Sequence, residues 1–201
     1  MVKRKPFVCG IFEDIESAAR YNEETKNRMR FLSGSFVSIA KQWGIVDGKV
    51  LDLGTGTGLL AIELAKTMPD LEVIGLDLSD VALEVARKNL QESEQPLRIS
   101  FKKGDAEDMP FEEGVFDLVV SSNTLHLIKN PVSMFNEIYR VLKSKDRFFL
   151  SDFRRSWLGL FSKHIRAAYS PQEVKDLLSQ SKLENWEVRD YFFWLSILSA
   201  K

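Results

Sequence analysis

The sequence is poor in several features that particular classes of protein require. Cys9 is the only cysteine among 201 residues, which excludes a framework of internal disulfides and a cysteine-based metal cluster. No apolar run approaches the roughly 20 residues that a membrane-spanning helix needs. The first residues, MVKRKPFVCGIF, include basic side chains but no apolar stretch of signal-peptide length. These absences predict a cytoplasmic protein with no membrane span and no metal site.

The chain also lacks a surplus of charge of either sign. Twenty-eight basic and 29 acidic residues leave a net charge of -1. Dedicated nucleic-acid-binding proteins usually carry a basic surplus, so this balance disfavours nucleic acid as a partner. We find no internal repeat and no low-complexity segment. The length fits one domain, and 44% hydrophobic residues suffice for a full core.

From residue 49 onward, short apolar segments alternate with amphipathic ones. Strands are predicted at 49–54, 71–79, 97–105, 115–122 and 146–153. Helices are predicted at 59–68, 80–92 and 171–181, and around the stripe of Phe135, Ile138, Tyr139 and Leu142. This order predicts a mainly parallel sheet that is covered by helices on both faces and has right-handed crossovers. Before the first strand, residues 14–43 are predicted to be helical, with a break near SGS at 33–35.

The C-terminal end departs from the alternation. The segments WEVRDY and FFWLSIL have almost no spacer between them, which is too short for a crossover helix and indicates an antiparallel pair. The expected fold is therefore α/β and Rossmann-like: a doubly wound, seven-stranded, mostly parallel sheet with one antiparallel strand in the C-terminal hairpin.

A glycine-rich turn, VLDLGTGTG at residues 50–58, follows the first predicted strand. Glycine permits a positive φ and a close approach of ligand to backbone, and the N–H groups of the following helix point toward whatever is bound. The phosphate-binding pattern is absent, because Leu59 and Leu60 stand where it needs lysine and a hydroxyl. The dinucleotide fingerprint fails by one position. Asp77, at the end of the second strand, can accept two hydrogen bonds from a ribose. A tight turn without a ligand is the alternative.

Four segments occur in a characteristic order and spacing: VLDLGTGTG, GLDLS, GDAEDMPF and FDLVVSSNTLHLIKNP. Together they resemble the class I S-adenosylmethionine-dependent methyltransferases, and most of all the small branch that includes the ubiquinone and menaquinone enzymes. The resemblance covers roughly residues 45–153. It implies a methyltransferase core at 45–201, N-terminal helices at 1–44 that form a lid, and a lid or acceptor segment near 153–170.

The resemblance also implies which residues bind S-adenosylmethionine. They are Asp52, Gly54, Thr55, Gly56, Asp77, Leu78, Asp105, Ala106, Ser121 and Tyr21. The glycine turn would line the methionine part, with Asp52 orienting either the turn or the amino group. Asp77 would hold the ribose hydroxyls and Leu78 would pack on the adenine, whose edge would meet Asp105 and the N–H of Ala106. Tyr21 would close over the cofactor.

Each of these roles has a plainer alternative. Asp52 would simply cap local N–H groups as a buried carboxylate, and Asp77 would cap the next helix, although Ser79 already meets that need. GDAEDMP would be a solvated turn, and Tyr21 a surface aromatic. Arg28 is expected to face solvent.

The segment SSNTLHLI follows the fourth strand, whose carboxyl end should face the sulfonium. By resemblance, Ser121, Ser122 and Asn123 lie nearest to it, and we take Asn123 and His126 as catalytic candidates. A histidine can act as a general base near neutral pH. The alternative is that His126 is only a packed side chain. Because the sulfonium is already an activated donor, alignment of the acceptor for in-line transfer counts for more than a strong base.

The expected acceptor is a small molecule. The segment after the fifth strand mixes basic and aromatic side chains: Arg154, Arg155, Lys163, His164, Arg166, Trp157, Phe161 and Tyr169. It would hold an anionic or aromatic acceptor, or it is an amphipathic lid with a solvated basic face. It lacks the long insertion that quinone methyltransferases often have. Two other functions stay open: a catalytically silent cofactor-binding partner subunit, and an RNA methyltransferase that uses the basic segment.

Overall fold

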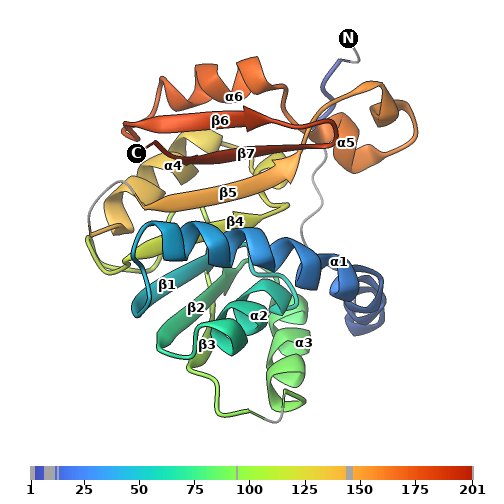
Figure 1. Cartoon of the computed structure of the whole chain (residues 1–201). Helices are drawn as coiled ribbons and strands as arrows, with labels where there is room; N and C mark the ends of the chain where they lie inside the picture. Colours follow the sequence, from blue (N-terminus) through green and yellow to red (C-terminus); the bar gives the residue numbers. More distant parts are fainter. Residues whose placement is uncertain (1–2, 7–11, 13, 94, 144–146, 201) are drawn as a thin grey trace.

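The structure of the protein, a computed structural model, describes residues 3–6, 12, 14–93, 95–143 and 147–200 (Figure 1). Its strands are β1 (Gly48–Leu53), β2 (Leu71–Asp77), β3 (Ile99–Lys103), β4 (Leu118–Ser122), β5 (Phe148–Phe153), β6 (Trp186–Asp190) and β7 (Trp194–Ser199). Its α-helices are α1 (Ile15–Gln42), α2 (Leu59–Thr67), α3 (Asp80–Gln91), α4 (Pro131–Val141), α5 (Lys163–Ala167) and α6 (Pro171–Leu178). Two short 3-10 helices are η1 (Leu125–Leu127) and η2 (Trp157–Leu160). Cys9 lies outside the described residues.

The strands form one seven-stranded sheet in the order β3-β2-β1-β4-β5-β7-β6. β1 to β5 pair in parallel, whereas β7 pairs antiparallel with both β5 and β6. The predicted fold class is therefore confirmed, including the single reversed strand in the C-terminal hairpin. The observed strands are a few residues shorter than predicted at β3 and β4, where the flanking residues belong to loops.

Both faces of the sheet are buried, which explains why the strands read as continuous apolar runs. Alternate residues of β1 point to opposite faces. Val50 joins one apolar core with α1 and α2, and Leu51 and Leu53 join the other with α4 and α6. Figure 1 shows α1 crossing one face of the sheet on the same side as α2 and α3. Because β1 pairs in parallel with both β2 and β4, the carboxyl ends of the three strands lie at one edge of the sheet, where a ligand site is expected.

Helix α1 is continuous over 28 residues, so the predicted break near 33–35 is wrong. Ser33 donates its hydroxyl to the carbonyl of Arg30 at 2.8 Å, which satisfies the side chain without interrupting the helix. Gly34 costs roughly 1 kcal/mol relative to alanine in a helix. Burial of Phe36 and Val37 outweighs that cost, because each large apolar side chain removed from water contributes about 1.5–3 kcal/mol.

The two edge strands of the sheet carry exposed charged residues. On β3 these are Lys102 and Lys103, the second of which pairs with Asp80. On β6 they are Glu187 and Arg189, which bond to each other at 3.0 Å. Charged side chains on an edge strand oppose pairing with another strand.

No helix in the described part of the chain has the length and apolar character required to cross a bilayer.

Candidate functional site

The glycine turn connects β1 to α2 and is fixed to the end of β2. The N–H groups of Gly54 and Thr55 both donate to the carbonyl of Leu76, at 2.8 and 3.0 Å. Gly54, Gly56 and Gly58 have φ values of 70°, 54° and 78°, which other residues adopt only with strain. A Cβ on Gly54 would collide with the Thr124 side chain, whereas a Cβ on Gly56 would meet nothing within 4 Å. The turn therefore presents a bare backbone toward open space at Gly56.

The carboxylate of Asp77 lies against this turn. Its Oδ2 accepts the N–H of Gly56 at 2.8 Å, and its Oδ1 accepts the N–H of Ser79 at 2.9 Å. Burial raises the pKa of Asp77, and these backbone donors act in the opposite direction. Helix α3 is capped by the hydroxyl of Ser79, which accepts the N–H of Ala82, so Asp77 is not the helix cap. A carboxylate has about four acceptor positions, which leaves capacity for two ribose hydroxyls. Leu78, next along the chain, is 48% exposed.

Asp52 is buried beneath the turn. Its Oδ2 accepts the hydroxyl of Thr55 at 2.7 Å. Burial raises the pKa of Asp52 to about 7, and the hydrogen bonds from Thr55 and the N–H of Ala61 only partly oppose the shift. These contacts are those of a residue that orients the turn. A contact of Asp52 with a cofactor amino group stays a prediction.

The raised pKa of Asp52 predicts how stability depends on pH. Because the folded protein holds this proton more tightly than the unfolded chain, the contribution of Asp52 to stability is present below pH 3.8 and is lost as the pH rises toward about 7. The Asp52→Asn variant stays neutral and keeps an oxygen for Thr55. We expect its free energy of unfolding, relative to the unmodified protein, to rise between these pH values by an amount on the order of a few kcal/mol. Urea titrations across this range measure the difference, and a constant difference would contradict the prediction.

The loop after β3 carries Asp105 and Ala106. Asp105 is exposed, and its Oδ1 accepts the N–H of Glu107 at 2.9 Å. Helix α4 holds the far end of the loop, because Glu137 accepts the N–H of Met109 at 2.7 Å. Arg140 in turn donates to the carbonyl of Met109 at 2.9 Å. The far end of the loop is therefore tied to α4, and the contact of Asp105 with adenine stays a prediction.

The end of β4 brings Ser121, Asn123 and Thr124 to the edge of the site. The buried hydroxyl of Ser121 donates to the carbonyl of Leu53 at 2.7 Å and so ties β4 to the end of β1. Asn123 has a φ of 59°, in the left-handed region, and residues held in such backbone conformations cluster at functional sites. Its Nδ2 approaches the hydroxyl of Ser122 at 3.3 Å. Among the described residues, its buried Oδ1 has no hydrogen-bond partner, which makes it a candidate acceptor for a ligand.

His126 is held by a partner that the sequence did not reveal, Asp152 at the end of β5. The two Asp152 oxygens lie 2.7 Å from the backbone N and from Nδ1 of His126. The Nε2 of His126 lies 3.1 Å from Nδ1 of His164 on α5. His126 and Asp152 are both buried, whereas His164 is half-buried. Asp152 could have been found by the criterion that selected Asp77, because it too is a carboxylate near the carboxyl end of a strand, here β5, the neighbour of β4.

Tyr21 lies on helix α1. Burial raises the pKa of Tyr21; nearby Arg28 lowers it, and the charges of Asp152 and Asp77 raise it further. Tyr21 is therefore within electrostatic reach of both the glycine-turn carboxylate and the His126 partner. Arg28 is exposed, as expected, yet its charge acts on this tyrosine.

A chain of amides fixes α1 to the glycine turn. The Nδ2 of Asn89 donates to the side-chain oxygen of Asn22 and to the carbonyl of Thr57, both at 2.8 Å.

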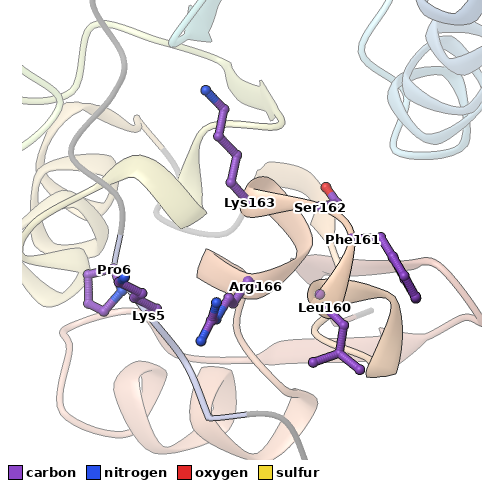
Figure 2. A pocket seen from close by; sticks show the side chains of 8 residues that line it. Lys5, Pro6, Leu160, Phe161, Ser162, Lys163 and Arg166 are labelled. Atoms are coloured by element: carbon purple, nitrogen blue, oxygen red, sulfur yellow. The ribbon is translucent and has the colours of Figure 1, made fainter.

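A hollow of about 510 Å³ lies between part of the 153–170 segment and the N-terminal residues Lys5 and Pro6 (Figure 2). Its lining residues are Lys5, Pro6, Gly159, Leu160, Phe161, Ser162, Lys163 and Arg166. No residue of the glycine turn contributes to it. It combines basic side chains with the exposed apolar side chains of Leu160 and Phe161 on the segment that carries His164. Arg154 and Arg155, in contrast, are engaged in ion pairs with Asp190 and Glu173.

The residues present fit S-adenosylmethionine. Gly56 faces open space beside a carboxylate, the exposed Leu78 offers an apolar surface next to it, and the buried Oδ1 of Asn123 is unpartnered within the described residues. No group of three or more described His, Cys, Asp or Glu side chains is arranged to bind a metal ion.

Comparison with known proteins identifies the family. The model of a family described as "Methyltransferase domain" matches residues 46–189. The ubiquinone/menaquinone biosynthesis C-methyltransferase UbiE of a Geobacter species is 30% identical over 115 residues, which are 57% of this chain and 49% of that enzyme. The malonyl-[acyl-carrier protein] O-methyltransferase of Geobacter sulfurreducens is 35% identical over 126 residues, which are 63% of this chain and 45% of that enzyme. The chain thus spans about half the length of these relatives.

The fold is shared with a protein of known structure. A crystal structure of a proposed S-adenosyl-L-methionine-dependent methyltransferase from Methanococcus maripaludis superposes with a TM-score of 0.76 at 24% identity, covering 100% of this chain and 98% of that one. Together with the family match over residues 46–189, the conclusion is that the chain belongs to the class I S-adenosylmethionine-dependent methyltransferases.

Proposed function

We propose that this protein transfers the methyl group of S-adenosylmethionine to a small-molecule acceptor. The observation that carries the proposal is the carboxylate of Asp77 bonded to the N–H of Gly56, with open space in front of that glycine. A sugar with two neighbouring hydroxyls fits the carboxylate, and a chain extending from that sugar fits the bare backbone. When bound, S-adenosylmethionine supplies a methyl group on a positively charged sulfur that needs no further activation.

The chain's own residues would bind and orient the reactants. Asp77 would accept from the ribose, and Leu78 would cover one side of the adenine. Asp105 and the N–H of Ala106 would meet the adenine edge, and Gly54, Thr55 and Gly56 would line the methionine part above Asp52. Ser121 and Asn123 stand at the end of β4 that would face the methyl group, and Tyr21 would cover the site from α1. Exclusion of water and alignment of the acceptor account for most of the rate in this proposal.

For the acceptor, we propose a molecule that combines an anionic group with an apolar part. The hollow of the 153–170 segment supports this, because Lys5 and Arg166 lie beside Leu160 and Phe161 there. The two relatives differ in acceptor: one is named a C-methyltransferase of quinone biosynthesis, the other an O-methyltransferase of malonyl-acyl-carrier protein. The likeness to them therefore supports the class of reaction more strongly than any single acceptor.

Two measurements test the proposal. Calorimetry with S-adenosylhomocysteine is expected to give one site per chain. Mass-spectrometric detection of methylated products, from a panel of quinols, phenols and acyl carboxylates, is expected to favour anionic members. The Arg166→Gln variant should raise KM for anionic acceptors without weakening the binding of S-adenosylhomocysteine. Lys175→Gln on α6 is the matched control and should change neither quantity. Cofactor binding without any product would favour the silent partner subunit, and absence of binding would refute the proposal.

A further inference from the structure

Methyl transfer from a sulfonium to an acceptor that is methylated at an O–H, N–H or C–H group, such as a phenol or a quinol, releases one proton, whereas an ionised carboxylate acceptor releases none. The released proton must leave a site from which water is excluded. The question is which group receives it, and the surroundings of His126 provide an answer that goes beyond the role of a single base. The answer rests on the proposed function, because it concerns the same site.

His126 is poorly placed to take a proton from the acceptor by itself. Its side chain is 1% exposed. Both ring nitrogens are engaged, Nδ1 with Asp152 at 2.7 Å and Nε2 with His164 at 3.1 Å. An acceptor molecule would have to displace one of these contacts in order to reach it.

Asp152 is bound as an ionised carboxylate would be. It accepts the backbone N–H groups of His126 and Phe153, at 2.7 and 2.6 Å, as well as contacting the Nδ1 of His126. Because Asp152 accepts hydrogen bonds here, it favours the tautomer of His126 that has its proton on Nδ1. The Nε2 of His126 then has a lone pair directed at His164.

We propose that Asp152, His126 and His164 form a proton relay in which His164 receives the proton of the methyl acceptor and His126 stores the resulting charge beside Asp152. His164 is the partly exposed member of the three and lies on α5 between Lys163 and Arg166, two of the residues that line the basic and apolar hollow. Asp152 is a positioning residue, because it acts through His126.

The proton balance is as follows. The acceptor gives its proton to Nε2 of His164, and the bonding electron pair stays on the acceptor to take up the methyl group. The proton on Nδ1 of His164 passes across the 3.1 Å contact to Nε2 of His126. His126 becomes an imidazolium, stabilised by the carboxylate of Asp152. The same contacts exist before and after the transfer, so no side chain has to move.

The charges around His164 suit this direction of transfer. Burial lowers the pKa of His164 to about 4, and the nearby positive charges of Lys163 and Arg28 add to that effect, whereas Asp152 opposes it. A proton that reaches His164 is therefore held weakly there, whereas His126 has the carboxylate of Asp152 in contact at 2.7 Å to stabilise a positive charge. The ring of Phe153 packs edge-on against His126, with ring centroids 5.4 Å apart, and shields it from water.

The chain has only two histidines, so nitrogen NMR resolves each imidazole without crowding. Above neutral pH we expect His126 to carry its proton on Nδ1 and none on Nε2. Asp152→Asn should lower the fraction of His126 that carries its proton on Nδ1, because an amide oxygen is a weaker acceptor than the carboxylate it replaces. Lys175→Gln, at an exposed position on α6, is the control and should leave the tautomer unchanged.

The His164→Asn variant separates the relay from packing. The asparagine amide can donate to Nε2 of His126, as Nδ1 of His164 does in the unmodified protein, but it cannot accept and release a proton. We expect an unchanged affinity for S-adenosylhomocysteine and a single-turnover methylation rate about 100-fold lower, in the range that general acid–base catalysis supplies. An unprotonated Nδ1 on His126, or an unchanged single-turnover rate in the His164→Asn variant, would overturn the relay. These spectra need neither cofactor nor acceptor, so a failure to bind S-adenosylhomocysteine would refute the proposed function separately.

Discussion

Asp77→Asn is expected to weaken binding of S-adenosylhomocysteine by at least about 100-fold. The variant keeps the shape of the side chain, but it has only one oxygen. Its NH2 group therefore faces the N–H of either Gly56 or Ser79, and two donors then point at each other. It also loses a charged acceptor for the ribose hydroxyls. Hydrogen bonds to a charged group contribute roughly 1.5–3 kcal/mol each, so loss of two corresponds to about two to four powers of ten.

Calorimetry measures this change, and Asp70→Asn is the matched control. Asp70 is an exposed aspartate that precedes β2, whereas Asp77 ends the same strand. Thermal unfolding of both variants shows whether the fold is retained. An Asp77→Asn variant that is folded and binds S-adenosylhomocysteine as the unmodified protein does would eliminate Asp77 as the ribose-binding residue.

Alanine substitutions in the glycine turn should separate stability from binding. Gly54→Ala combines a strained positive φ with a collision against Thr124, and we expect a loss of about 2–5 kcal/mol, or roughly 10 °C in Tm. Gly56→Ala has the φ strain alone, about 1–2 kcal/mol, because its Cβ meets nothing within 4 Å. That Cβ enters the space assigned to the cofactor, so binding of S-adenosylhomocysteine should fall by at least about 10-fold, the equivalent of about 1.4 kcal/mol.

Gly114→Ala is the control for this pair. Gly114 has a φ of 68° and likewise leaves open space for a Cβ, but it lies in the loop before β4 and outside the proposed site. The Gly114→Ala variant should lose as much stability as Gly56→Ala and should bind S-adenosylhomocysteine with the affinity of the unmodified protein. Equal binding by the Gly56→Ala and Gly114→Ala variants would show that the space in front of Gly56 is not used by the cofactor.

The sequence was informative wherever a rule acts over a few residues. Alternating strands and helices, the glycine turn and an acidic residue at the end of the second strand are all local patterns. They led to the correct sheet and to Asp77 as a candidate, whose role in binding stays a prediction. The break expected at 33–35 was wrong because serine and glycine were weighed without the burial of Phe36 and Val37, which depends on the packing of α1. Local propensity is weak against such tertiary contacts.

The partners of His126 could not be predicted in the same way. Asp152 reaches it because β4 and β5 are neighbours, with Ser122 paired to Ser151, and strand order is not encoded in any one segment. His164 appeared in the sequence as one member of a basic run. Its position depends on the packing of the five-residue helix α5 beside η1, for which no local pattern exists.

The charged edges of the sheet affect how copies of the chain meet. At one border, strand β3 presents Lys102 and Lys103; at the other, β6 presents Glu187 and Arg189. Addition of a strand from a second molecule would bring these ionised groups into a less hydrated seam, at a desolvation cost that edge-to-edge backbone pairing must overcome. Growth of the sheet into ribbons or fibrils is thereby discouraged at both borders, even though each strand between them is strongly apolar.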